Sequence, residues 1–177
     1  MKIRYLLIIA AITVCSSMAV SAQPKAKTPT FTSSYTSLSV GCKTMHGSNG
    51  TDDAFLCKGP AGYQIRIYYS AAATHLAAEL KGKDTTFPIA MANMDFNEAK
   101  VKAEWRLANG KPFALIIRMP KYGDPAEGEY FGKLIGHELV VTGLLGFESL
   151  KTSIDTKTTG ANALAREAAD AEYLAKH

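Results

Sequence analysis

Alternation of apolar and polar residues is clearest in residues 100–119, on either side of Asn109-Gly110. Before this turn signal every second residue is apolar and the residues between are charged, which is the period of a half-buried strand. The apolar set is Val101, Ala103, Trp105 and Leu107, and the charged set is Lys102, Glu104 and Arg106. We therefore predict a β-hairpin with one face in the core and one in water, and we interpret Trp105 as a core aromatic.

Two loop lengths give different pairings for this hairpin. A two-residue loop would place Trp105 opposite Ala114 and Arg106 opposite Phe113, so that apolar and charged side chains share a face. A three-residue loop ending in a left-handed Gly110 keeps the two faces separate. The pairs that it predicts are Trp105 with Phe113, Ala103 with Leu115, and Val101 with Ile117. We favour the three-residue loop because a one-residue slip would turn the apolar set to water.

The same patterns assign most of the remaining chain. Strands are predicted at residues 35–45, 54–58, 63–69 and 150–154. Residues 134–144, a long apolar run, are expected to form a central strand. Residues 71–80 are either a short helix or an edge strand, since alanine favours helix while the neighbouring segments favour sheet. Residues 81–100 are interpreted as a connection.

A helix is predicted for residues 161–175, which are rich in alanine, the strongest helix former. Its surface is expected to carry two i,i+4 ion pairs, Arg166–Asp170 and Glu172–Lys176. The stripe expected to pack on the sheet is Leu164, Ala168, Ala171 and Ala175. The fold class is therefore α+β: a bent antiparallel β-sheet or incomplete sandwich of about six or seven strands, with the C-terminal helix packed on it.

The N-terminus has the features of a secretory signal peptide. Lys2 and Arg4 precede an apolar run at residues 5–14, and Val20-Ser21-Ala22 offers a cleavage site after Ala22. The apolar run of about ten residues is too short to span a bilayer, so we expect no transmembrane anchor after cleavage. The predicted organisation is a signal peptide at 1–22, a flexible leader at 23–32 and a single α+β domain at 33–177.

The three cysteines divide between the signal peptide and the mature chain. Cys15 raises the alternative of a lipoprotein, but Val14 is bulky where that processing needs a small residue. The mature chain keeps Cys42 and Cys57, which in an oxidising compartment predict a disulfide closing a ring of about sixteen residues. A redox or metal pair is the alternative, although a redox pair is more often spaced C-x-x-C.

The charge of the chain is close to balanced. It holds 20 Lys and Arg residues and 16 Asp and Glu residues, and cleavage would remove two of the basic ones, leaving a net charge of about +2. With no basic cluster, there is no electrostatic basis for binding nucleic acid. We expect an exported protein, periplasmic or secreted, without a nucleic-acid partner.

Two loops rich in turn-forming residues are the candidate binding sites. They span residues 46–53 and 121–130, and each includes acidic side chains. Their candidate ligand or partner residues are His46, Asp52, Asp53, Tyr122, Asp124 and Glu127. Asp52-Asp53 lacks the spaced ligand set of a calcium loop.

Two further patterns bear on metal chemistry. His137-Glu138 does not complete the zinc-protease pattern, because Val141 stands where the second histidine is needed. Methionine and histidine near each other in sequence suggest a copper or zinc carrier, although methionine as a gap-filler in the core is the plainer interpretation. The residues concerned are Met45, His46, Met91 and Met94.

Several short motifs are spread over most of the mature chain. They are Tyr35-Thr36-Ser37-Leu38, Cys42, residues 57–63, Glu104-Trp105-Arg106, residues 110–114 and residues 162–170. With these motifs the chain resembles a group of small exported bacterial proteins of unknown function. The resemblance implies export and one compact domain, and no particular activity. Members carry a further cysteine near the start of the last strand, where this chain has Phe147-Glu148-Ser149, so the resemblance does not extend to a second disulfide.

The leading hypothesis is an exported, non-enzymatic envelope protein that binds a protein or cell-wall component through the two loops. A periplasmic hydrolase is the alternative, in which the fold would have to gather His46, His75 and His137, since the chain has neither a G-x-S-x-G nor an H-E-x-x-H motif. A copper or zinc carrier is a further alternative. The leading hypothesis requires no cofactor and no catalytic residue, and the sequence indicates no oligomeric state.

Overall fold

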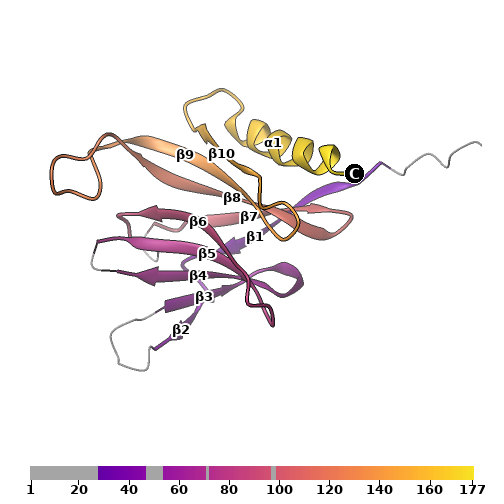
Figure 1. Ribbon diagram of the computed structural model, residues 1–177, viewed down its shortest axis with the longest axis horizontal. Coiled ribbons are helices and arrows are strands. Elements are labelled where there is room, and N and C mark those ends of the chain that lie inside the picture. The colour runs from indigo at the N-terminus through magenta and orange to yellow at the C-terminus, as the bar shows by residue number, and fades with distance from the viewer. Residues whose placement is uncertain (1–27, 47–53, 71, 97–98) are drawn as a thin grey trace, which may run out of the picture.

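The computed structural model describes residues 28–46, 54–70, 72–96 and 99–177, which form two five-stranded antiparallel sheets and one helix. Sheet A has the order β1 (Phe31–Ser37), β7 (Lys102–Ala108), β8 (Lys111–Tyr122), β9 (Leu134–Gly143) and β10 (Lys151–Asp155). Sheet B has the order β2 (Lys43–Met45), β3 (Ala54–Lys58), β4 (Tyr63–Tyr69), β5 (Thr74–Leu80) and β6 (Thr86–Ala92). Helix α1 (Ala161–Ala175) lies on sheet A, so sheet A is the middle of three layers (Figure 1). The predicted α+β class is confirmed, with more strands than expected.

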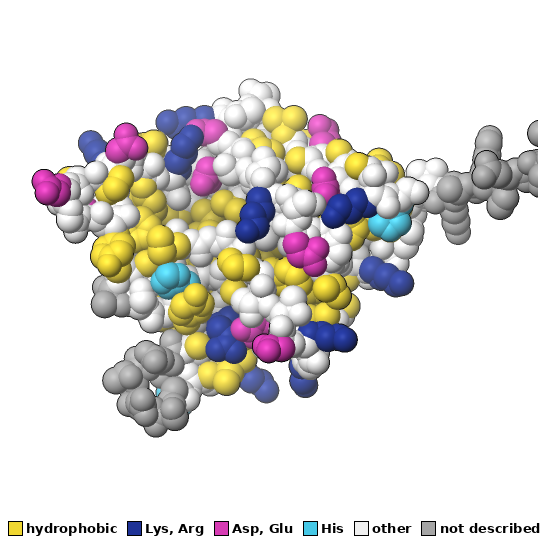
Figure 2. All heavy atoms as spheres, in the orientation of Figure 1, with side chains coloured by type: hydrophobic (Ala, Val, Ile, Leu, Met, Phe, Trp, Pro, Cys, Tyr) yellow, Lys and Arg dark blue, Asp and Glu magenta, His cyan; other side chains and the backbone are white. Residues whose placement is uncertain are grey.

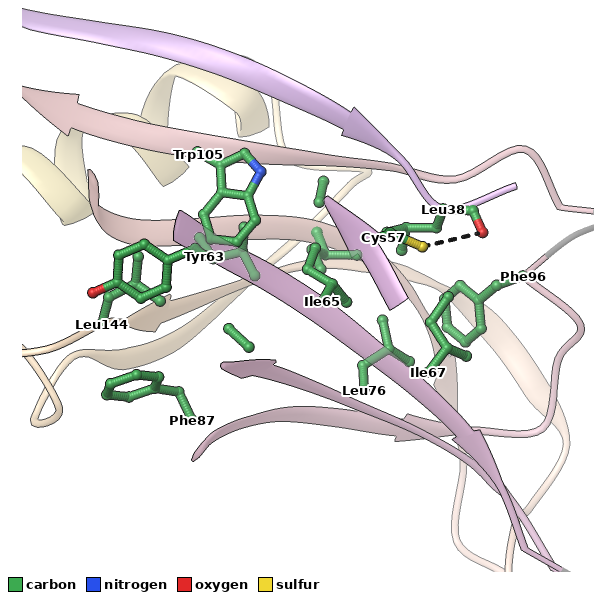
Figure 3. Close-up of a cluster of buried hydrophobic side chains, with 14 of the residues drawn as sticks. Leu38, Cys57, Tyr63, Ile65, Ile67, Leu76, Phe87, Phe96, Trp105 and Leu144 are labelled. Carbon is green, nitrogen blue, oxygen red and sulfur yellow. Dashed lines mark hydrogen bonds between the residues drawn. The ribbon is translucent and has the colours of Figure 1, made fainter. Parts of the chain in front are cut away.

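The two sheets enclose the larger core. Trp105, from β7, is fully buried and packs against Tyr63 of β4, with ring centroids 5.8 Å apart. Figure 3 shows these two rings pointing into the space between the sheets, beside Ile65. The indole Nε1 of Trp105 donates a hydrogen bond to the Thr36 hydroxyl, 2.9 Å away, which satisfies a polar group that burial would otherwise penalise. The prediction of a core aromatic at Trp105 is confirmed.

The β7–β8 hairpin is present, but its predicted register is wrong. Asn109 and Gly110 both have positive φ, 49° and 79°, as a two-residue hairpin loop requires. A β-bulge then inserts Phe113 as an extra residue, so that Trp105 lies opposite Leu115 and not opposite Phe113. The bulge restores the separation of faces that the two-residue loop alone would lose, because it turns Phe113 toward the helix.

The face of sheet A that α1 covers is shielded from water. Glu104 is only 8% exposed, although the alternating pattern predicted that it would face water. The helix has the predicted bounds, but its buried stripe is Ala161, Ala165 and Ala169. Leu164, which was expected in that stripe, is 39% exposed. The orientation of α1 differs from the prediction because Arg166 and Asp170 pair with Glu104 and Arg106 of β7.

Two strands of sheet B were not recognised in the sequence. Residues 74–80 form β5, an interior strand between β4 and β6, and are neither a helix nor an edge strand. Residues 81–100 contain β6, an edge strand that accommodates Pro88. Tertiary pairing overrides the helix preference of the alanines here. The strands predicted at 54–58 and 63–69 are β3 and β4, and those predicted at 134–144 and 150–154 are β9 and β10 with bounds that differ by one residue. The single strand predicted at 35–45 is wrong, because β1 ends at Ser37 in sheet A and β2 begins at Lys43 in sheet B.

The disulfide between Cys42 and Cys57 is present, and it ties the segment after β1 to β3. Strand β1 begins at Phe31, two residues before the expected start of the folded domain. Within the described ranges no helix is long and apolar enough to cross a membrane.

Candidate functional site

The outer face of sheet B is the surface that the three layers leave open. Sheet A is covered by sheet B on one side and by α1 on the other. In the part of the chain that the structure describes, no helix or strand packs over the opposite face of sheet B. Figure 2 shows hydrophobic side chains gathered over the strands of this sheet, with charged side chains beside them.

One row of side chains crosses this face from edge to edge. Cross-strand pairing places five residues next to one another in the order Met45, Ala54, Tyr68, His75 and Met91, one from each strand. We call this the apolar row. Met45, Tyr68 and Met91 are 44%, 40% and 48% exposed, which is high for large apolar side chains. At its centre the rings of Tyr68 and His75 are stacked, 4.7 Å apart and within 5° of parallel.

The next rows become steadily more polar. Lys43, Leu56, Arg66, Ala77 and Pro88 form a mixed row beside the apolar row, and Lys58, Gln64, Glu79 and Thr86 form a polar row beyond it. The Glu79 carboxylate accepts hydrogen bonds from Arg66 Nε at 2.5 Å and from Gln64 Nε2 at 3.0 Å. These bonds hold the Arg66 and Gln64 side chains in place between the rows. The face therefore has an apolar side and a hydrogen-bonding side.

Two of the hollows along these rows border the apolar row. The first, of about 350 Å³, is bordered by Tyr68, His75, Pro88 and Met91 and extends past the edge of β6 to Lys151 of sheet A. The second is wider and more open, about 720 Å³, and lies over Ala54, Arg66, Tyr68, Tyr69, Ser70, Glu79 and Thr86. Hollows of this size can hold a small molecule or several side chains of a partner.

Tyr69 stands at the rim of the wider hollow, where its hydroxyl is bound to Asp95. Burial raises the pKa of Tyr69, and the nearby Asp95 carboxylate raises it further. The hydroxyl donates to Asp95 Oδ1 at 3.4 Å. Tyr69 therefore stays protonated at neutral pH.

The residues predicted as a site do not come together. His46 is exposed directly after Met45 at the end of β2, next to the apolar row, whereas Asp52 and Asp53 lie outside the described residues. Asp124 and Glu127 are exposed in the connection between β8 and β9, which belongs to sheet A. Figure 1 shows β2 and this connection in different layers.

Tyr122 has a structural role in that connection. Its hydroxyl donates to the carbonyl of Asn93 and accepts from the amide of Asn93, both at 3.1 Å. Its ring packs against Phe131 with centroids 4.9 Å apart. These contacts fasten the end of β8 to the segment after β6.

The methionines predicted as gap-fillers are on the surface in two cases, since Met45 and Met91 are exposed. They stand at opposite ends of the apolar row, four strand spacings or about 19 Å apart, so they cannot share a metal ion. Among the described residues, no group of three or more His, Cys, Asp or Glu side chains is placed to hold a metal.

The sequence carried a weak signal for the apolar row. Tyr68 falls on the wet side of the alternating run at 63–69, which placed one large aromatic in water. The other members of the row could not be predicted, because the sequence pattern did not indicate β5 or β6. A row across a sheet is defined by the strand order and the register.

No protein-family model matches the chain, and no curated protein and no solved structure matches it either. The function is therefore argued from the site itself.

Proposed function

We propose that this chain is an exported, non-enzymatic envelope protein that binds a protein partner on the outer face of sheet B. The apolar row is the observation that carries the proposal, since it exposes Met45, Tyr68 and Met91 along one line of a face that no described element covers. An exposed row of large apolar side chains bordered by polar ones is typical of a surface that binds a partner. The N-terminal signal pattern and the Cys42–Cys57 disulfide support export.

The composition of the face favours a polypeptide over a wall polysaccharide. Met, Tyr and Arg are enriched at protein interfaces, and exposed methionines adapt to the shape of a partner. The row spans about 19 Å, the length of about six residues of extended chain. Lys43 of the mixed row and Lys58 of the polar row lie on the same face and make no ion pair among the described residues. We therefore expect a partner segment with apolar side chains bordered by acidic ones.

The test compares two double variants of the mature chain. Tyr68→Ser with Met91→Ser removes the apolar row, whereas Leu164→Ser with Leu174→Ser changes two exposed leucines on α1 as a matched control. A photo-crosslinking residue at position 45, at the end of the row, reports contact in cells. We expect a defined polypeptide adduct that the row variant reduces at least tenfold and the control leaves unchanged.

Two results would overturn the proposal. One is an adduct that survives protease but is released by a wall-degrading hydrolase, which would make the ligand a cell-wall component. The other is loss of the adduct in Asp124→Ser with Glu127→Ser and not in the row variant, which would return the site to the loop at 121–130.

A hydrolase is the second candidate, and one contact favours it. The Ser70 hydroxyl lies 3.1 Å from His75 Nε2, a serine–histidine pair beside the wider hollow. The same hydroxyl accepts from the Ala73 amide at 3.2 Å and lies 3.1 Å from the Ala73 carbonyl, so it also closes a turn. Hydrolysis of p-nitrophenyl acetate by the wild type and not by Ser70→Ala would support this candidate, and equal rates would dismiss it.

A further inference from the structure

We propose a second binding site, for a phosphomonoester, on the helix side of sheet A. A hollow of about 360 Å³ lies there between the first turn of α1 and the start of β7. Its floor is apolar, formed by Ile116 and Leu139, each 4% exposed. Three cationic residues, Lys100, Lys102 and Arg118, line it. This site is independent of the outer face of sheet B.

The register of the hairpin brings two of these cations together. Ala103 pairs with Ile117, so continuing the ladder by one residue places Lys102 across from Arg118 on the same face. Side chains in such a position start about 5 Å apart, and like charges there destabilise a sheet. An anion bound between them would relieve this repulsion.

The acidic side chain at this hollow does not neutralise them. Glu104 also lines the hollow, but its carboxylate is bound by Arg166 at 2.6 and 3.0 Å and by the Ser33 hydroxyl at 2.6 Å. Across the described residues, none of the salt bridges includes Lys100, Lys102 or Arg118. Among the described residues, three positive charges therefore lie around one concave surface without an ion-pair partner.

Neutral donors complete the site. The Tyr35 hydroxyl, which also lines the hollow, accepts a hydrogen bond from Arg166 Nη2 at 3.2 Å, so its own proton is available to a ligand. The amide side chain of Asn162, in the first turn of α1, is exposed at the same rim.

These features indicate which class of ligand the site would bind. A phosphomonoester carries close to two negative charges at neutral pH and three acceptor oxygens, which suits three cations better than a single carboxylate does. The guanidinium of Arg118 can bind two phosphate oxygens at once, and the lysines act as point charges. The apolar floor formed by Ile116 and Leu139 fits the carbon part of an ester. A soluble phosphomonoester and a lipid headgroup share this chemistry.

The test measures binding of glycerol 3-phosphate and of phosphatidylcholine vesicles containing phosphatidic acid, at constant ionic strength. The site variant is Lys102→Gln with Arg118→Gln. Its control is Lys111→Gln with Lys133→Gln, which removes the same charge from exposed positions away from this hollow. We expect the site variant to weaken binding at least tenfold and the control to leave it within twofold. Binding to vesicles alone identifies a lipid headgroup as the source, and binding of glycerol 3-phosphate identifies a soluble ester.

Thermal unfolding separates this role from a structural one. Without ligand, the site variant should melt at or above the temperature of the wild type, because it loses the repulsion between Lys102 and Arg118. With saturating ligand, the wild type should gain melting temperature and the variant should not. The proposal is overturned if neither probe binds saturably, if the control loses affinity equally, or if the site variant melts lower without ligand.

Discussion

Glu104 of β7 and Arg166 of α1 form a two-pronged ion pair, with Arg166 Nε 2.6 Å from Oε1 and Nη2 3.0 Å from Oε2. A second such pair joins Arg106 to Asp170 at 2.7 and 2.6 Å. Ser33 links the two pairs, because its hydroxyl donates to Glu104 at 2.6 Å and accepts from Arg106 at 3.1 Å. This network fixes the rotation of α1 and directs its alanine stripe onto the sheet.

The Glu104–Arg166 pair should be energetically coupled. In a double-mutant cycle with Glu104→Gln and Arg166→Gln, we expect a coupling free energy of about 1–2 kcal/mol, since the carboxylate is mostly buried while the guanidinium is partly exposed. Guanidinium chloride unfolding of the four proteins measures it. The control cycle is Glu172–Lys176, a 3.5 Å pair within the helix, for which about 0.5 kcal/mol or less is expected. Equal coupling in both cycles would contradict this account.

The same carboxylate should make stability depend on pH. Burial alone raises the pKa of Glu104, but hydrogen bonds from Arg166 and Ser33 outweigh it and hold the pKa below its ordinary value of 4.5. A carboxyl group with a depressed pKa contributes stability above its unfolded-state pKa and loses it as the pH falls through the folded-state pKa.

The measurement is the free energy of unfolding from pH 7 down to pH 3. The difference between the wild type and Glu104→Gln should be constant above about pH 5 and should shrink below about pH 4.5. A difference that stays constant to pH 3 would show that the charge of Glu104 contributes nothing to folding.

The pattern of residues along the chain is sufficient to predict those helices and turns that depend only on residues near in sequence. The bounds of the helix follow from its alanine content, and the hairpin turn follows from Asn109-Gly110. The prediction of which side of the helix is buried was wrong, because that side depends on the partners of Arg166 and Asp170. Arg166 and Asp170 are one turn apart and would pair in an isolated helix, but β7 offers each of them a partner in a better geometry.

The candidate site was harder to predict for the same physical reason. A loop can be predicted from its composition alone, and residues 46–53 and 121–130 are rich in turn-forming residues. The apolar row takes one residue from each of five strands, and successive members are separated by a turn or loop between strands. Only the strand order and the registers bring Tyr68 and His75 next to each other, and these were unknown where β5 and β6 were misassigned.

Gly59 should be intolerant of even a single added carbon. A Cβ at this position would collide with the Cζ2 atom of Trp105, whose ring is fully buried and cannot move aside. Gly59→Ala should therefore lower the free energy of unfolding by about 1–3 kcal/mol, measured in guanidinium chloride.

Two controls test the cause of that loss. Gly136→Ala should change stability by only about 0.5 kcal/mol, because its Cβ would meet the Lys157 side chain at an ordinary 3.8 Å. In a Trp105→Phe background the smaller ring should reduce the penalty of Gly59→Ala. A penalty that is the same with Trp and Phe would locate the strain elsewhere.

The disulfide should stabilise the domain by restricting the unfolded chain. Cys42 and Cys57 are 15 residues apart, so loss of the bond in Cys42→Ser should lower stability by about 2–4 kcal/mol, roughly ten degrees in melting temperature. Cys57 is 1% exposed and packs in the core between the sheets, so alanine is the better replacement there. Cys42→Ser with Cys57→Ala should lose little more than the single variant, because the constraint is lost once.

The control for this prediction compares protein made in a reducing compartment with oxidised protein. Protein made without residues 1–22 in a reducing cytoplasm should melt like the Cys42→Ser variant, and oxidation should restore the difference. Thiol titration checks the bond directly, since intact protein purified from the periplasm should expose no reactive thiol from Cys42 or Cys57 before reduction. Two equivalents of thiol in that sample would mean that the pair is reduced there, and the redox or metal interpretation of the two cysteines would then take its place.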